Sequence, residues 1–521
     1  MMRLQWPRSR NRRQRAYRKR VQAARAQLSA PYEAQIANGD EERYPNYIAS
    51  FSKCLQHDDL GEVDPASYRA MVSAIQSGDI AAFEKLNPHT KRRIAGPLGG
   101  RCFSLSSPDA QALTLPPPPT FESAETAAEM AELYWMSLTR DVPFARYGEN
   151  ELVAMAAKDL SRLQGSTIDP RHLFLANYPG VADGPRVSQF LLWSFDFDGV
   201  PVDQKRTVPL PSSDLGLELM TSYDEWLAAQ RGVPTDGLSE PPIDPQRRYP
   251  RNSRDLGWCA DQSAINTTYL NVALLLLGLG RRALDSAHPY KTSLFIGGLG
   301  TFDIAHLETL IGQAARAHQL SYQKWFHRRL RPEAFSGRIH NTVTKGASYP
   351  IHQSILDSPV LQYVFDQNAR MNQRRGLNDG KGTYLLSCLW GEGSPTHPSY
   401  PQGHGTAAGI GATLLKAWFD EDFVLPERTA VKPNYDGTQL EPYVYGKDGP
   451  ALTIGGELNK LAYNITWGRN MSGVHYRSDG VAANTLGEQI AIRLLREDRM
   501  TVSEGFSGFG LTQFGGTRIV I

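Results

Sequence analysis

Apolar and polar residues follow one another along this chain mainly with the spacing of helices. After about residue 260 that spacing becomes regular over four stretches, which are separated by connections that contain Gly and Pro. These stretches are residues 261–283, 303–330, 403–419 and 480–496. The pattern predicts a helical bundle in the C-terminal half.

The N-terminal half has a weaker pattern. Residues 65–86 have the spacing of short helices, and residues 123–138 predict a helix that begins at an N-cap, Ser123, after the stiff proline run 116–119. Residues 38–47 and 60–64 predict loops. Between residues 165 and 258, the alternation of Trp193, Phe195 and Phe197 suits a short hairpin or a long ordered loop.

These patterns together predict a mainly α fold, a large helical bundle with long ordered loops and a few short strands. No internal repeat indicates a solenoid or a propeller. We divide the chain into a basic arm (1–32), a helical and loop region packed on the core (33–258) and a helical-bundle catalytic region (259–521).

Composition and charge are those of an ordinary globular protein. Hydrophobic residues make up 41% of the chain, and a formal net charge of +2 gives no overall attraction to nucleic acid or to an anionic membrane. Residues 1–32 nevertheless contain ten Arg or Lys and no acidic residue before Glu33. A solvated or partner-packing extension is the favoured interpretation of this arm, and an RNA- or membrane-touching tail is the alternative.

The sequence predicts neither a membrane span nor a signal peptide. Its longest apolar run, residues 272–279, is far shorter than the roughly 20 residues needed to cross a bilayer. The short segment after the basic stretch is interrupted by polar residues, so export is not indicated and the location is expected to be cytoplasmic or stays open. The four cysteines lie far apart without a CxxC pair, so the sequence indicates neither a cysteine zinc site nor a dithiol redox site, and it leaves one or two disulfides unassigned.

The first segment with candidate chemistry is Lys-Trp-Phe-His-Arg-Arg-Leu-Arg-Pro, residues 324–332. Lys324 and Arg331 are seven residues apart, about two helical turns, which predicts that both cations leave one helix face. We expect Pro332 to end or kink that helix just after Arg331. Arg328 and Arg329 fit a solvated basic face, and alone the whole segment favours that interpretation.

The second segment, His-Pro-Ser-Tyr-Pro-Gln-Gly-His-Gly over residues 397–405, leads into an Ala- and Leu-rich helix. A glycine turn at a helix start exposes free backbone N–H groups, which predicts an anion-binding site at Gly403. His404 is next to that anion-binding site and is placed to donate or accept a proton.

The third segment places Arg469 six residues before His475 and Asp479 four residues after it. His475 could supply one nitrogen ligand, and Asp479, at the start of a following helix, could fix its tautomer by bonding the other ring nitrogen. A polar loop with an N-cap Asp is the alternative interpretation.

Together the three segments provide two Arg, a Lys, a glycine-lined helix start and two His, a complete set for a tetrahedral anion. They resemble the signature shared by vanadium haloperoxidases and type 2 phosphatidic acid phosphatases. Flanking stretches such as Ser-Pro-Thr-His-Pro-Ser-Tyr-Pro at 394–401 extend the resemblance to bacterial and algal haloperoxidases. It covers most residues after about 35.

The resemblance implies a vanadate cofactor and a site residue by residue. His475 would bind the vanadium, and His404 would be the acid/base toward hydrogen peroxide. Lys324 would also polarise the peroxide for attack by halide. The vanadate oxygens would be held by Lys324, Arg331, Arg469, the Gly403 amide and, with less certainty of contact, Gln402.

The chain departs from the family at Gln402, where a Ser usually stands, so a hydroxyl contact to vanadate is lost. His397 stands where brominating members have a second histidine, which favours bromide. Ser321 stands where many members place Trp or Arg near the halide, and this leaves iodide open. The implied partners are peroxide, halide, a small organic acceptor and further copies of the chain, as a dimer or larger homo-oligomer; no nucleic acid is expected.

Two other functions fit the same residues. An acid phosphatase would use His475 as nucleophile, forming a phosphohistidine, and His404 as the acid for the leaving group. A non-catalytic structural or nucleic-acid-binding assembly would use the basic arm and an inherited anion pocket. The histidine at 397 and the long chain favour the peroxidase.

Overall fold

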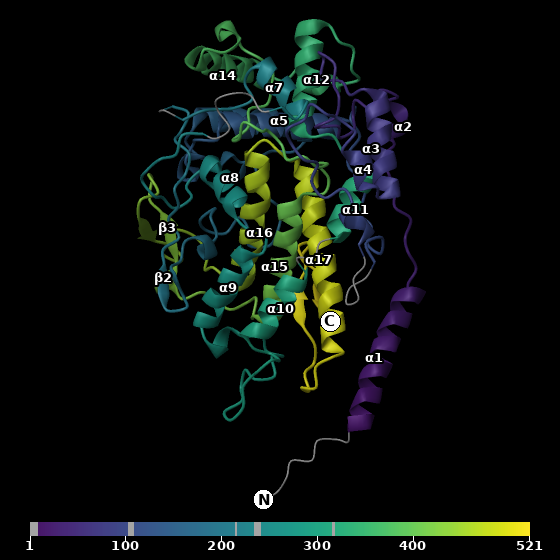
Figure 1. The fold of residues 1–521 in the computed structure, drawn as a ribbon. Coiled ribbons are helices and arrows are strands. Elements are labelled where there is room, and N and C mark those ends of the chain that lie inside the picture. Colours follow the sequence, from purple (N-terminus) through teal and green to yellow (C-terminus); the bar gives the residue numbers. More distant parts are fainter. Residues whose placement is uncertain (1–8, 103–108, 214–215, 234–240, 315–317) are drawn as a thin grey trace, which may run out of the picture.

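Three long helices form the centre of the molecule. The computed structural model describes residues 9–102, 109–213, 216–233, 241–314 and 318–521. Within it α15 (Gly403–Trp418) packs against both α16 (Ile454–Met471) and α17 (Arg477–Arg499). A shorter helix, α8 (Ser253–Gln262), packs on α16, and these helices lie side by side (Figure 1).

Glycines allow α15 and α17 to approach closely. A Cβ added at Gly409 of α15 would lie 2.3 Å from the Asn484 carbonyl oxygen, and one at Gly487 of α17 would lie 2.2 Å from that of Thr406. Both distances are far below van der Waals contact. The two backbones therefore touch directly, which fixes the helix starts that carry the candidate site.

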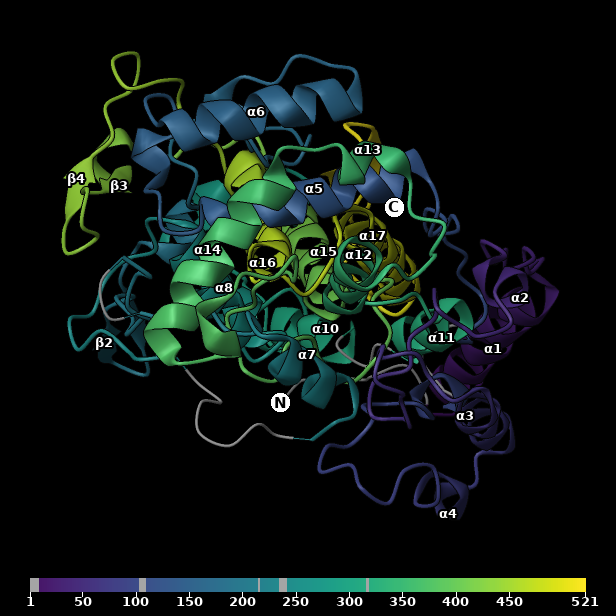
Figure 2. The same cartoon turned by 90° about the horizontal axis from the view of Figure 1, so that it is seen from above.

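Further helices surround this centre. In the view from above, α5, α6 and α14 lie across one side of the central helices (Figure 2). The surrounding helices are α5 (Ala124–Leu138), α6 (Glu151–Gln164), α7 (Tyr223–Gln230), α9 (Thr267–Gly278), α10 (Ile304–Ala314), α11 (His318–His327), α12 (Pro332–Lys345), α13 (Gln353–Leu356) and α14 (Val360–Arg375). Those nearer the N-terminus are α1 (Ser9–Ser29), α2 (Asp40–Arg43), α3 (Pro65–Ser77) and α4 (Ile80–Phe83).

Strands are short and confined to three antiparallel pairs in the described part of the chain. They are β1 (Phe195–Phe197) with β2 (Val200–Val202), β3 (Val431–Pro433) with β4 (Leu440–Pro442), and β5 (Gly510–Thr512) with β6 (Arg518–Val520). Short 3₁₀ turns are η1 (Gly99–Arg101), η2 (Phe144–Arg146), η3 (Pro170–His172), η4 (Gln189–Leu191), η5 (Arg281–Ala283), η6 (Asn378–Gly380) and η7 (Glu427–Thr429). The mainly α prediction is confirmed, as is the hairpin around Phe195.

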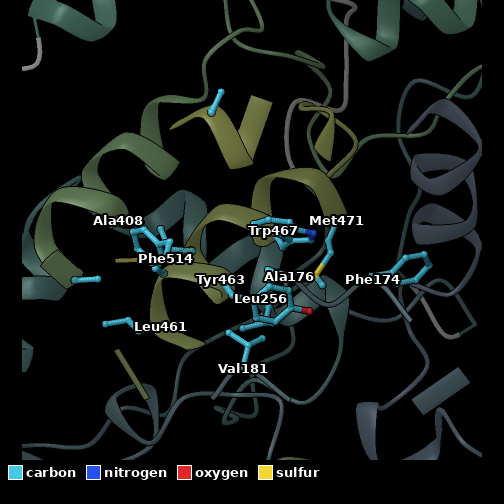
Figure 3. Close-up of a cluster of buried hydrophobic side chains, with 14 of the residues drawn as sticks. Phe174, Ala176, Val181, Leu256, Ala408, Leu461, Tyr463, Trp467, Met471 and Phe514 are labelled. Carbon is cyan, nitrogen blue, oxygen red and sulfur yellow. The ribbon is translucent and has the colours of Figure 1, made fainter. Parts of the chain in front are cut away.

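The hydrophobic core surrounds α16. Trp467, Tyr463 and Met471 of this helix are fully buried, and they pack with Leu256 of α8 and Ala408 of α15 (Figure 3). The same cluster takes in residues from the N-terminal half, among them Val181. The predicted division at residue 258/259 stays a prediction; α8 runs across it.

Several element boundaries differ from the sequence prediction. The helices that were not expected are α1, α6, α7, α8, α12, α13, α14 and α16. The stretch from 261 becomes helical again only at Thr267, after α8 ends. The predicted loop 38–47 contains the single turn α2. The helices expected at 65–86 and 123–138 are present, and the Ser123 hydroxyl accepts the Thr126 amide as its N-cap. Residues 1–8 of the predicted arm and 315–317 of the predicted helix 303–330 lie outside the described residues.

The expected helix from 303 through Arg331 is wrong at its end. Helix α11 ends at His327, and Arg328 has the left-handed φ of +44°. Pro332 is then the first residue of a new helix, α12, with Arg331 as its N-cap. Proline suits a first helical position because its missing N–H has no partner there. Lys324 and Arg331 therefore do not share a helix face.

No described helix is both long enough and apolar enough to cross a membrane. All four cysteines are free in the structure; Cys54, Cys259 and Cys388 are buried and Cys102 is exposed.

Candidate active site

The site lies where three connections meet: the turn between α11 and α12, the segment 397–405 that enters α15, and the turn between α16 and α17. Arg331 joins all three. Its Nε donates to the His397 carbonyl oxygen at 2.8 Å and its Nη1 to that of Val474 at 2.8 Å. Arg331 and Lys324 thus converge through the loops that they bind.

Lys324 is buried among backbone carbonyls. Its Nζ donates to Pro398 O at 2.9 Å and to Pro401 O at 2.5 Å. Burial, aided by the positive charge of Arg331, lowers the pKa of Lys324 well below its usual value. Burial likewise lowers the pKa of Arg331 to about 9. Among the described residues, neither cation has a carboxylate within ion-pair distance.

His475 is held between Asp479 and Arg331. Its Nδ1 lies 3.1 Å from Asp479 Oδ2, and its Nε2 lies 2.9 Å from Arg331 Nη1. A carboxylate can only accept a hydrogen bond, so the nitrogen that faces it, Nδ1, carries the hydrogen. The other ring nitrogen, Nε2, keeps its lone pair. Burial and the charge of Arg331 lower the pKa of His475 well below its usual value, so the ring is neutral.

Asp479 is itself surrounded by donors. It accepts hydrogen bonds from Ser399 Oγ at 2.5 Å, from Arg329 Nη1 at 2.8 Å and from the Tyr476 amide at 3.1 Å. Burial opposes ionisation, but the charge of Arg329 and the bond from His475 outweigh it and lower the pKa of Asp479. The predicted orienting role of Asp479 has the geometry that it needs.

Two residues predicted as a solvated basic face are not solvated. Arg329 is buried and pairs with both Asp479 and Glu129, and Arg328 is half-buried and pairs with Glu41. The spacing of the Arg-Arg pair gave no sign of this, because their partners are distant in sequence.

The start of α15 has open space where a side chain on Gly403 would lie. A Cβ added at Gly403 would meet one atom within 4 Å, of Leu320 at 3.8 Å. The next residue, His404, lies close enough to Arg469 and Lys324 to be affected by their charge. Burial, with these two cations, lowers the pKa of His404 to about 3, which leaves a neutral imidazole beside the open amide.

Gln402 turns away toward a neighbouring helix. Its Nε2 donates to Asn470 Oδ1 at 3.1 Å, while its Oε1 and the Asn470 Nδ2 have no partner among the described residues. The side chain packs near Gly405, where a Cβ would lie 3.2 Å from Gln402 Oε1. The long amide is therefore accommodated by the missing Cβ at 405.

Arg469 lies in the last turn of α16, and not in the polar loop that was the alternative interpretation of its segment. Its Nη1 pairs with Asp261 Oδ1 at 2.5 Å, and its guanidinium lies 4.7 Å above the Trp390 ring. Its Nε is buried without a partner in the described part of the chain. Asp261 and Trp390 belong to the site, and no spacing in the sequence indicated them.

The end of α8 contacts two site residues. Asp261 pairs with Arg469, and two residues later the backbone of Ser263 lies near the imidazole of His404. One short turn thereby positions an anion-binding cation and the candidate acid/base.

His397 and Ser321 are the two residues that the family resemblance associates with the halide. His397 Nδ1 lies 2.8 Å from Arg331 Nη2, and burial with the charge of Lys324 lowers its pKa well below the usual value. Ser321, one turn before Lys324, donates to Gly96 O at 2.7 Å.

These residues fit an oxyanion better than a bare metal ion. Burying a cation without a counter-charge is costly, so the unpaired Lys324 and Arg331 favour an anion between them. The Arg469 Nε, which has no partner among the described residues, and the Gly403 amide at the helix start add hydrogen-bond donors for such an anion. Among the described residues, no group of three or more His, Cys, Asp or Glu could hold a metal ion. His475, whose Nδ1–H is held by Asp479, directs the lone pair of its other ring nitrogen toward Arg331.

Comparison with known proteins relates this chain to haloperoxidases. A family model described as the second helical-bundle domain of VCPO matches residues 377–503. The chain is 37% identical over 517 residues to a vanadium-dependent bromoperoxidase of Ascophyllum nodosum, aligning 94% of this chain with 89% of that protein. This chain belongs to the vanadium-dependent bromoperoxidase family.

Other members show the same relationship. A vanadium-dependent bromoperoxidase of Corallina officinalis is 31% identical, with 96% of this chain and 97% of that protein aligned. The solved homohexameric structure of the second vanadate-dependent bromoperoxidase of Ascophyllum nodosum superposes with a TM-score of 0.90 at 29% identity, covering 99% of this chain and 91% of that one. The haloperoxidase resemblance is confirmed, and the family is one of enzymes.

Proposed function

We propose that this chain oxidises halide, bromide by preference, with hydrogen peroxide at a vanadate bound between His475 and the buried cations. The observation that carries the proposal is the state of His475, whose Nδ1–H is committed to Asp479 and whose Nε2 lone pair faces Arg331 at 2.9 Å. A neutral, oriented imidazole next to uncompensated cations suits a ligand that is both Lewis acid and oxyanion.

The cations and the helix start would hold the oxygens. Lys324, Arg331 and Arg469 supply positive charge, and the Gly403 amide supplies a donor at the positive end of the α15 dipole. When bound, vanadate activates peroxide toward attack by halide without a change in its oxidation state. Gln402 has no hydroxyl to offer the anion, and its amide nitrogen is engaged with Asn470.

His404 is the acid/base of the proposal. Its pKa of about 3 leaves the ring unprotonated near neutral pH, so it accepts the proton that peroxide loses. Lys324 donates hydrogen bonds to peroxide and polarises it. His397, neutral and bonded to Arg331, faces the halide and favours bromide.

The proposed partners are peroxide, bromide and a small organic acceptor of the oxidised halogen. A homo-oligomer is also proposed, supported by the homohexameric relative that superposes over nearly the whole chain.

The test is bromination of a phenol dye by metal-stripped protein with peroxide and bromide, before and after addition of orthovanadate. We expect turnover only with vanadate, suppression by phosphate, and loss in His475→Ala. Turnover without vanadate would contradict the proposal. Hydrolysis of p-nitrophenyl phosphate in place of bromination would instead identify a phosphatase.

A further inference from the structure

Helix α1 stands away from the rest of the chain. It projects from the body on the side of the N-terminus (Figure 1), and a hydrogen bond from Gln27 to Glu497 of α17 ties its last turn to the body. Most of its described side chains are exposed. Because most helices in proteins are stabilised by packing, a helix left in water suggests a partner outside the single chain.

One face of α1 carries an apolar row. Tyr17, Val21, Ala24 and Leu28 are spaced by four, three and four residues, which places them on one side of a helix. Tyr17 is 66% exposed and Leu28 is 89% exposed. The row predicts contact with an apolar surface along much of the helix, which is about 31 Å long at 1.5 Å per residue.

The charge of α1 is opposite to that of the body. All 54 acidic residues but only 46 of the 56 Lys and Arg lie in residues 33–521, which leaves that part at −8, whereas residues 1–32 carry +10. Two α1 helices would repel one another, but α1 and the body of another copy attract.

We propose that α1 docks on the body of a second copy of this chain, with its apolar row against the partner. An RNA or an anionic bilayer would also attract the arm, but either would be repelled by the negative body behind it. The proposal rests on the homo-oligomer of the proposed function and assigns it a contact segment.

The body presents exposed apolar surface at the end from which α1 projects. The loop between η5 and α10 extends from that end (Figure 1), and Leu294, Phe295, Ile296 and Leu299 within it are between 67% and 96% exposed. A group of apolar side chains this exposed is typical of a protein contact surface. The molecule thus offers both halves of an apolar contact.

The experiment is light scattering of the purified full chain, at low and at high salt. We expect an oligomer whose mass falls at least twofold in Tyr17→Glu/Leu28→Glu and in Arg15→Glu/Arg18→Glu/Lys19→Glu. The matched control Val200→Glu/Tyr435→Glu changes two residues that are 60% and 62% exposed in loops or strands of the body and should keep the wild-type mass. High salt should weaken the assembly.

An unchanged mass in both arm variants would overturn the proposal, as would arm-dependent binding of RNA or anionic vesicles by a chain that stays monomeric. Bromide oxidation is measured on the same preparations. A monomer that oxidises bromide would refute the assembly and leave the catalytic proposal intact. An arm-dependent oligomer that oxidises no halide would support the assembly and refute the catalytic proposal.

Discussion

Arg329 and Asp479 form a buried ion pair, with 2.8 Å between Nη1 and Oδ1. Asp479 also accepts from His475, so Arg329 is the counter-ion of the carboxylate that orients the proposed vanadium ligand. Arg329 is further held by Glu129 at 2.9 Å and lies 3.9 Å above the Tyr476 ring. Its role is to position Asp479, and through it His475.

We expect Arg329→Gln to lower the free energy of unfolding by about 3–5 kcal/mol, because it leaves two buried carboxylates without their counter-charge. Vanadate affinity should fall by roughly 10- to 100-fold as His475 loses its orientation. Urea unfolding and equilibrium dialysis with vanadate measure the two effects. Arg328→Gln, which breaks the half-buried pair with Glu41, is the control and should cost about 1 kcal/mol or less. Wild-type affinity in Arg329→Gln would show that the pair does not support His475.

His404→Ala should lower kcat for bromide oxidation by about 10²- to 10⁴-fold while vanadate still binds, because the base for peroxide is removed and the anion-binding cations remain. Steady-state kinetics and vanadate dialysis of the same variant separate the two steps. The exposed His352→Ala is the control. A kcat within tenfold of wild type would exclude His404 as the acid/base.

Gln402→Ser should tighten vanadate binding by about 1 kcal/mol, the usual net value of one hydrogen bond, since it restores a short hydroxyl donor beside Gly403. The change also releases Asn470, so Asn470→Ala is the matched control for loss of the Gln402–Asn470 bond. Vanadate dissociation constants of both variants test this. Equal tightening in both would mean that release of the amide pair, and not the hydroxyl, is responsible.

Acid should destabilise the folded chain through buried histidines outside the site. Burial lowers the pKa of His57 from 6.5 to about 3, so between these values the unfolded chain binds more protons than the folded one. The free energy of unfolding therefore falls as pH drops below 6.5, by up to about 1.4 kcal/mol per pH unit for each such group. Urea unfolding between pH 7 and 5 should show a shallower slope in His57→Gln. The same slope in wild type and variant would contradict the assignment.

The sequence indicated which residues come together at the site, but it did not indicate the backbone geometry that brings them together. Lys324 and Arg331 were expected on one helix face, yet they lie on either side of a helix break and converge through the carbonyls of residues 397–401. The error has a physical source: a proline after a basic run fits the start of a helix as well as its end.

Helix α16 escaped prediction because it is buried all round. Its polar residues have partners inside the protein: Lys460 pairs with Glu457, and Asn464 donates to the Arg186 carbonyl oxygen. An apolar stripe is expected only where one helix face meets solvent, so a buried helix with satisfied polar groups lacks that signal. Arg329 was misassigned for a related reason, since Glu129 and Asp479 are visible as partners only in the fold.

The last turn of α8 lies next to two residues of the proposed site, so substitutions there can affect both. Its Asp261 pairs with Arg469, the proposed vanadate-binding arginine, and the Ser263 backbone that follows lies near His404, the proposed acid/base. A shift of this turn would change the surroundings of Arg469 and His404 together, so we expect it to alter vanadate affinity and turnover in parallel. The Asp261 side chain is 32% exposed, so a residue in contact with solvent pairs directly with a buried arginine of the proposed site.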